Sequence, residues 1–310
     1  MCLISLAIER HDRFPLVIAT NRDERFARPA APLDWWPDGG ATPQSVSVLG
    51  GRDLASGGTW LALGSNARMA MLTNVRDPSR LRALAPSRGS IVPGWIASTQ
   101  RAAEFWPAWA AMPHNPFNLL AADFTERASG QWWWADDRRA PVALGTGIHG
   151  LSNAGLATPW PKVRRLDAAM EQALNTSDAS PASIECALFA ALGDRSAVAD
   201  ADLPDTGIGL ARERMLGTAF ISLPGADAAS AYGTRCSTVL IVEREAGRCT
   251  ARLVERSFDA AGSVTRQRGV RMPWPLFRVA SDVVDEDFNP SRAPSPGAGC
   301  PPLRTARPAA

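Results

Sequence analysis

Two apolar runs separated by a polar break open the chain. The runs CLISLAI (2–8) and FPLVIAT (14–20) flank the polar residues 9–13, a pattern that is typical of a β-hairpin. Because both runs are apolar on both faces, we expect this hairpin to be buried between layers. A turn centred in the polar break predicts that Cys2 lies opposite Asn21.

The rest of the chain contains more strand-like runs than helical ones. Runs typical of strands lie at 59–64, 68–74, 117–124, 131–135, 147–153, 217–223, 237–244 and 250–258. Apolar residues at helical spacing predict three amphipathic helices, at about 94–111, 162–175 and 182–193. Many antiparallel-looking strands with few helices favour an α+β fold in which sheets pack on each other and helices lie outside.

The end of the chain differs from the rest in composition. From residue 289 onward it is rich in Pro, Ala and Arg without periodicity, which is typical of a disordered tail. We therefore expect a single domain over residues 1–288 and a tail over 289–310.

Composition narrows the class of protein. The 310 residues are 45% hydrophobic and 21% charged, with a formal net charge of +2, which predicts a soluble globular protein without a nucleic-acid partner. No stretch approaches the roughly 18 apolar residues of a membrane span, and the N-terminus lacks the pattern of a signal peptide. The five cysteines are odd in number and lack metal or haem spacing. This argues against a disulfide framework and a metal site, and favours a reducing, cytoplasmic location.

Cys2 is the first candidate for chemistry. If Met1 is removed, the α-amine of Cys2 can act as general base for its own thiol, and its reference pKa near 8 leaves a useful neutral fraction. Cysteine is otherwise often a small buried hydrophobe. The run TNRDE (20–24) places an arginine and carboxylates near this thiol, where they either hold it as a thiolate or form a polar turn.

Further polar positions fall at the ends of strand-like runs. Asn74 and Asn153 either cap turns or donate to an oxyanion, and Arg235 makes a surface ion pair or lines a site. The glycines of GGTW (57–60) suit a tight turn or a close approach to a ligand. GTGIHG (145–150) fits the spacing of a dinucleotide-binding loop, but no helical period follows, so we predict a strand and turn there.

Several longer motifs carry a family resemblance. They are MC at the start, ATNRDERFARPA, GGRDLASGGTWLAL, MLTNVRDP, FNLLAADF, GLSNAGLATPWPKV and YGTRCSTVLIV, in this order over about residues 1–258. In these motifs the chain resembles the NRDE family, also called the transport and Golgi organisation protein 2 family. That family is grouped with the N-terminal-nucleophile hydrolases. The resemblance therefore implies a four-layer αββα sandwich, with two antiparallel sheets face to face and helices outside.

The resemblance also implies a set of site residues. Cys2 matches the nucleophile of choloylglycine hydrolases and penicillin V acylases, which cleave amides. Arg22 and Asp23 fall near the arginine and aspartate of the RNLD motif of those enzymes, although the order and spacing differ.

Three later positions complete the implied site. Asn74 and Asn153 match asparagines at or near the oxyanion hole, and Arg235 corresponds to a late active-site arginine.

Two functions stay open at this point. The first is the handling of a small apolar ligand, as in haem trafficking or lipid and acyl handling, which the eleven tryptophans favour if they do more than pack the core. Cys2 or His149 would then be the axial ligand of a transported haem. The second is a cofactor-independent hydrolase of a linear N-acyl amide with Cys2 as nucleophile, which the clustering of polar strand ends favours. The sequence does not predict the oligomeric state.

Overall fold

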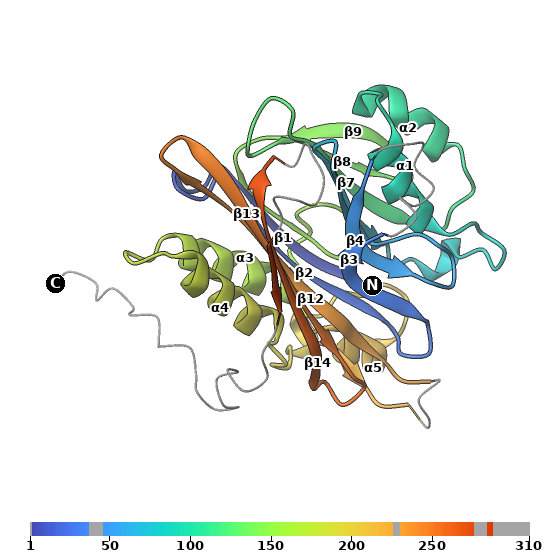
Figure 1. Cartoon of the computed structure of the whole chain (residues 1–310). Coiled ribbons are helices and arrows are strands. Elements are labelled where there is room, and N and C mark those ends of the chain that lie inside the picture. Colours follow the sequence, from blue (N-terminus) through green and yellow to red (C-terminus); the bar gives the residue numbers. More distant parts are fainter. Residues whose placement is uncertain (1, 37–45, 226–229, 276–283, 288–310) are drawn as a thin grey trace.

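Two antiparallel sheets packed face to face, with helices on both outer sides, form the four layers of the computed structural model (Figure 1). The structure describes residues 2–36, 46–225, 230–275 and 284–287. The αββα sandwich that the family resemblance implies is therefore confirmed, and the α+β class with it.

The first sheet contains the N-terminal hairpin. Its strands, in spatial order, are β10 (Gly147–Leu151), β1 (Cys2–Ile8), β2 (Leu16–Arg25), β12 (Tyr232–Glu245), β13 (Arg248–Phe258), β14 (Val264–Trp274) and β15 (Val284–Asp287), and the short β11 (Ser222–Leu223) pairs with β12. The hairpin lies inside the sheet, between β10 and β12, so no edge of it is left unpaired.

The second sheet follows chain order. Its strands are β3 (Ala30–Trp35), β4 (Val48–Asp53), β5 (Leu61–Gly64), β6 (Arg68–Asn74), β7 (Phe117–Asp123), β8 (Gln131–Asp136) and β9 (Arg139–Leu144). The helices α1 (Ile91–Ala97) and α2 (Ala102–Ala110) cover its outer side.

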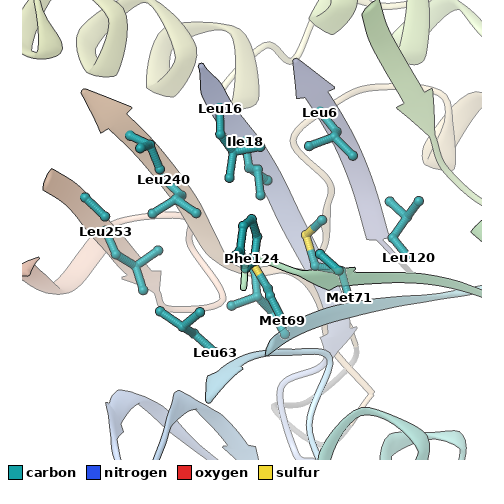
Figure 2. Close-up of a cluster of buried hydrophobic side chains, with 14 of the residues drawn as sticks. Leu6, Leu16, Ile18, Leu63, Met69, Met71, Leu120, Phe124, Leu240 and Leu253 are labelled. Atoms are coloured by element: carbon teal, nitrogen blue, oxygen red, sulfur yellow. The ribbon is translucent and has the colours of Figure 1, made fainter. Parts of the chain in front are cut away.

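Three apolar layers hold the sandwich together. The central one lies between the sheets, where Leu6, Leu16 and Ile18 meet Met69 and Leu120 (Figure 2). The helices α3 (Pro161–Leu174) and α4 (Pro181–Leu192) bury the outer side of the first sheet. The short helix α5 (Leu210–Leu216) follows α4 along the chain.

Strand β1 shows why the hairpin is apolar on both faces. Successive side chains of a strand point to opposite sides. Leu3 and Ala7 therefore pack in the layer under the helices, whereas Ile4, Leu6 and Ile8 pack between the sheets. All seven residues of β1 are buried, which confirms the predicted buried hairpin.

Some of the predicted elements differ from the observed ones. The predicted register is wrong by one residue, because Cys2 pairs with Arg22 and Leu3 pairs with Asn21. The helix predicted over 94–111 is two helices, α1 and α2, because the backbone turns to an extended conformation at Ser98. Of the strand predicted over 217–223, only Ser222–Leu223 forms. The glycine run at 145–150 leads into β10, as predicted.

Two further expectations concern the cysteines and the tail. Cys2, Cys236 and Cys249 are free thiols, whereas Cys186 is disulfide-bonded. The sequence argued against a disulfide framework and did not predict this bridge, for which an odd count of cysteines still leaves room. The predicted tail lies outside the described residues, and the single domain over 1–288 stays a prediction. Within the described part of the chain, no helix is both long and apolar enough to cross a bilayer.

Candidate functional site

A cavity of about 330 Å³ lies where the start of β1 faces the second sheet. Strands of both sheets contribute to its wall, and so does the loop before α1. The wall residues that carry charge or a polar group are Cys2, Arg22, Asp23, Glu24, Arg28, Asp53, Ser56, Thr59, Asn74, Ser87, Arg88 and Asn115. The apolar part consists of Trp60, Leu72, Ala85 and Pro86.

Cys2 is the first residue of β1 and is 7% exposed. Its carbonyl oxygen accepts a hydrogen bond from the Ser152 hydroxyl at 3.0 Å, which ties the start of the strand to the loop after β10. Burial raises the pKa of the thiol, and the nearby Asp23 carboxylate raises it further, while Arg22 lowers it. The thiol is therefore protonated at neutral pH, and a reaction at Cys2 needs a base to take that proton.

Asp23 is a residue of β2 and lies close to the Cys2 thiol. Its Oδ1 accepts a hydrogen bond from the Thr234 hydroxyl at 2.7 Å, and its backbone carbonyl accepts one from the Tyr232 hydroxyl at 3.1 Å. Burial raises the pKa of this carboxyl, while Lys162 and the Thr234 hydrogen bond lower it. Strand β12 therefore fixes Asp23 in the wall of the cavity.

Arg22 separates two cavities. Its guanidinium carbon lies 3.9 Å from the centre of the Trp60 ring, in a cation–π stack. Both side chains line the Cys2 cavity and also a second cavity of about 240 Å³. We call this pair the Arg22–Trp60 partition.

The two predicted asparagines occupy different positions. Asn74, at the end of β6, lines the Cys2 cavity. Asn153 is buried and does not belong to the cavity wall; its Nδ2 donates to the Asn74 carbonyl oxygen at 2.9 Å, and its own carbonyl accepts from the backbone of Arg76 at 2.7 Å. Asn153 thus holds the backbone that carries Asn74.

Arg235 lies in the second cavity, on the other side of the partition. Its Nη1 donates to the carbonyl oxygens of Arg25, Phe26 and Arg28 at 2.9 to 3.2 Å. The side chain therefore fastens the segment after β2. Cys2, Arg22, Asp23 and Asn74 come together in one cavity, and Asn153 and Arg235 contact its supporting backbone.

Arg88 is a cavity residue that the sequence did not indicate. It is half-buried in the loop before α1, and its Nη1 donates to the Pro116 carbonyl at 3.0 Å. The GGTW motif explains its position, because the backbone of Gly58 lies so close to Gly89 that a Cβ at position 58 would come within 2.4 Å of the Gly89 carbonyl carbon. Gly58 therefore allows the loop that carries Arg88 to pack closely against the GGTW segment.

Lys162 is a second residue that was not predicted, although it is the chain's only lysine. It lies in the first turn of α3, is 2% exposed, and its Nζ donates to the Leu216 carbonyl at 3.1 Å. Burial lowers its pKa to about 8, and Asp23 opposes that shift. Beside it, Arg76 and Glu213 form a buried ion pair at 2.5 Å. Its being the only lysine sets Lys162 apart in composition, but no local pattern of the sequence indicates that it lies near Cys2.

The described residues contain no group of three or more His, Cys, Asp or Glu side chains placed to hold a metal ion. His149, the candidate haem ligand, shares a hydrogen bond of 2.8 Å with the Gly145 carbonyl through its Nε2 and does not line the Cys2 cavity.

The architecture and the cavity define an αββα sandwich with a cysteine at the start of its first strand. Residues 1–260 match the model of the family described as Transport and Golgi organisation 2. The chain belongs to this family.

Relatives of the same family extend over most of the chain. The bovine (Bos taurus) Transport and Golgi organization protein 2 homolog is 32% identical over 256 residues, which cover 79% of this chain and 90% of that protein. The human (Homo sapiens) homolog is 30% identical over 260 residues, with the same coverage.

Two solved structures are similar at low identity. One is an N-acylethanolamine-hydrolyzing acid amidase ortholog from Caenorhabditis elegans, with a TM-score of 0.42 and 11% identity over 78% of this chain and 92% of that chain. The other is a mutant of the conjugated bile acid hydrolase from Clostridium perfringens, with a TM-score of 0.39 and 11% identity over 93% and 97%.

Proposed function

We propose that the protein hydrolyses a linear N-acyl amide with Cys2 as its N-terminal nucleophile. The observation that supports this is the position of Cys2 in the wall of a polar cavity, with Arg22 and Asp23 from the next strand and Asn74 from the facing sheet. A nucleophile, charged groups that act on it and an amide donor are the parts that acyl transfer requires.

The proposed reaction has two stages. After removal of Met1, the α-amine of Cys2 takes the thiol proton and the sulfur attacks the amide carbonyl, forming a carbon–sulfur bond. The Asn74 amide donates to the developing oxyanion. The carbon–nitrogen bond then breaks, and the leaving amine takes the proton from the α-ammonium. Water cleaves the resulting thioester, which releases the carboxylic acid and restores the thiol.

In this scheme Asp23 and Arg22 act on the charge of Cys2. Asp23 stabilises the α-ammonium that forms during attack, and Arg22 stabilises the thiolate. Asn153 and Arg235 contribute as supports of the backbone around them.

The first experiment tests whether Cys2 has a free amine and a reactive thiol. The intact mass of the purified protein is measured before and after brief alkylation, and the labelled site is mapped. We expect loss of Met1 and labelling of Cys2 ahead of Cys249. A panel of N-acyl amides is then screened with the wild type and with Cys2→Ala. Retained Met1, or equal turnover in the two proteins, would contradict the proposal.

A second candidate function is the handling of a small apolar ligand, including haem trafficking or lipid and acyl handling, in the cytoplasm. The apolar part of the cavity wall, made by Trp60, Leu72, Ala85 and Pro86, favours it. Titration of the protein with haemin tests the haem version, for which we expect a saturable shift of the Soret band. Absence of that shift would contradict haem binding, and an unchanged shift in Cys2→Ala would show that the thiol is not the ligand.

A further inference from the structure

Two arginines of the Cys2 cavity form no close ion pair with a described residue, although each has a carboxylate at longer range: Glu255 for Arg22 and Glu24 for Arg88. The Arg22 side chain donates no hydrogen bond and forms no ion pair among the described residues, and its guanidinium stacks on the Trp60 ring. Arg88 donates from Nη1 to the Pro116 carbonyl and has no carboxylate within ion-pair distance in the described part of the chain. Arg22 is 6% exposed and Arg88 is half-buried, so water compensates each cation only in part.

The acidic groups of the cavity are already engaged elsewhere. Asp53 forms an ion pair with Arg28 at 2.7 Å. Asp23 accepts from Thr234, and Glu24 accepts from the backbone N–H of Arg25 at 2.8 Å. Each of these carboxylates accepts a hydrogen bond from elsewhere in the protein, and none of them forms an ion pair with Arg22 or Arg88, although Glu24 influences Arg88 at longer range.

Contacts with the cavity wall and with the backbone behind it hold both residues in place. The Trp60 ring, which also lines the cavity, stacks on the Arg22 guanidinium. The loop of Arg88 is fixed by the hydrogen bond from the Thr59 backbone to the Gly89 carbonyl at 3.0 Å and by the contact between Gly58 and Gly89. Both guanidiniums line the cavity that contains Cys2, and guanidinium N–H groups are the donors that bind carboxylate and phosphate oxygens most strongly.

We propose that Arg22 and Arg88 form an anion-binding subsite next to Cys2, and that the amide substrate carries a carboxylate close to the bond that is cleaved. The preferred substrates are then N-acyl amino acids and not neutral N-acyl amines. This rests on the proposed function for the identity of the reacting bond, whereas the subsite itself rests on the two arginines alone.

The test compares two alkylating probes of similar size and different charge. Iodoacetate is an anion and iodoacetamide is neutral, and both alkylate a thiolate with release of iodide. The ratio of their rate constants at Cys2 is divided by the same ratio for free glutathione. At low salt we expect a normalised ratio of about ten, which falls as salt is raised.

Substitutions in the loop that carries Arg88 test whether this residue causes the preference of Cys2 for iodoacetate. Arg88→Gln should lower the normalised ratio severalfold, and Arg88→Lys, which keeps the charge, should retain most of it. Arg82→Gln is the matched control, since it removes an exposed arginine of the same loop that does not line the cavity. A wild-type ratio near one, a loss of preference in both Arg88 variants, or an equal fall in Arg82→Gln would overturn the subsite.

Protection of the thiol then tests the substrate class. N-octanoylglycine should protect Cys2 from iodoacetamide at a concentration about tenfold lower than N-octanoylethanolamine does, and equal protection would overturn the predicted carboxylate. Neither readout depends on turnover. A protein that prefers the anionic probes but cleaves no amide would therefore disprove the proposed hydrolysis and support the subsite.

Discussion

Two buried thiols lie on either side of the same arginine. Cys2 on β1 and Cys236 on β12 both pair with Arg22 on β2, and burial raises the pKa of both. They differ in their second neighbour. Cys236 donates to the Glu255 carboxylate, which raises its pKa further, whereas Cys2 faces a larger polar cavity together with Asp23. The comparison teaches that a thiol's other neighbours, beyond burial and a nearby cation, distinguish a candidate nucleophile from a structural one.

The largest expected effect separates the two thiols directly. Cys2→Ala should reduce turnover of an N-acyl amide by about 10⁴-fold, because it removes the proposed nucleophile. Cys236→Ala should change turnover by no more than about threefold, since that thiol lies across the partition from the reacting bond. The rates are measured with one substrate under single-turnover conditions. Equal losses of turnover in the two variants would contradict the assignment of Cys2 as the nucleophile and Cys236 as a structural residue.

Buried charge provides a second difference, because Lys162 lies on the Cys2 side. Its pKa is lowered from 10.5 to about 8 in the folded protein, so between these values the unfolded chain binds more protons. The free energy of unfolding should therefore rise with pH across this window, by at most about 3 kcal/mol.

Lys162→Met should lose this rise, and urea unfolding at pH 8 and pH 10 measures it. Lys162→Arg is the matched variant that keeps a cation throughout the window. The prediction fails if wild type and Lys162→Met show the same change in unfolding free energy between the two pH values.

Asp23 should affect the thiol and the reaction in opposite directions. Since Asp23 raises the pKa of Cys2, Asp23→Asn lowers that pKa, and more thiolate is present at pH 7. Alkylation of Cys2 should therefore become severalfold faster, while turnover falls about 100-fold because the α-ammonium loses its counter-charge. Arg22→Gln should slow alkylation. If Asp23→Asn moved both rates in the same direction, Asp23 would have no separate role in the reaction.

The smallest effect concerns the loop of Arg88. Gly58→Ala forces a Cβ against the Gly89 backbone and should lower the unfolding free energy by about 1–2 kcal/mol. The same change should reduce the preference of Cys2 for iodoacetate. Gly145→Ala is the control, because a Cβ there meets no atom within 4 Å. Thermal unfolding of both variants measures the difference, and an equal loss in the control would show that the Gly58 contact has no special role.

Local patterns predicted much of the fold. Strand β6 and helix α3 have strong periodicity, and both lie within one residue of their predicted bounds. Strands β4, β9 and β14 were missed because glycine, proline or charged residues interrupt their patterns. They are strands because a neighbouring strand pairs with them, and a single sequence does not reveal that pairing.

From the sequence, only those site residues that lie at the ends of strands could be predicted. Cys2, Arg22, Asp23 and Asn74 were found because each lies at the end of an apolar run. The predicted register placed Asn21 opposite Cys2, where the structure has Arg22. An error of one residue changes the side of the sheet to which a side chain points, because neighbours on a strand face opposite sides. Asn21 in fact points to the helix layer, where its Nδ2 donates to the Leu192 carbonyl at 2.9 Å.

The residues that escaped prediction have no local pattern. Arg88 begins a single 3-10 turn, Arg88–Ser90, and Lys162 lies in an ordinary α-helix. Only the packing of these segments brings them close to Cys2.

The Arg22–Trp60 partition sets a length limit. The Arg22 and Trp60 residues border both the Cys2 cavity and the second cavity, and a stack of this kind contributes about 1 kcal/mol. We expect this pair to limit the length of a molecule that binds beside Cys2. We expect replacement of Trp60 by a residue with a small side chain to join the two cavities. The size of the side chain at this one position would then determine how long a molecule can bind beside Cys2.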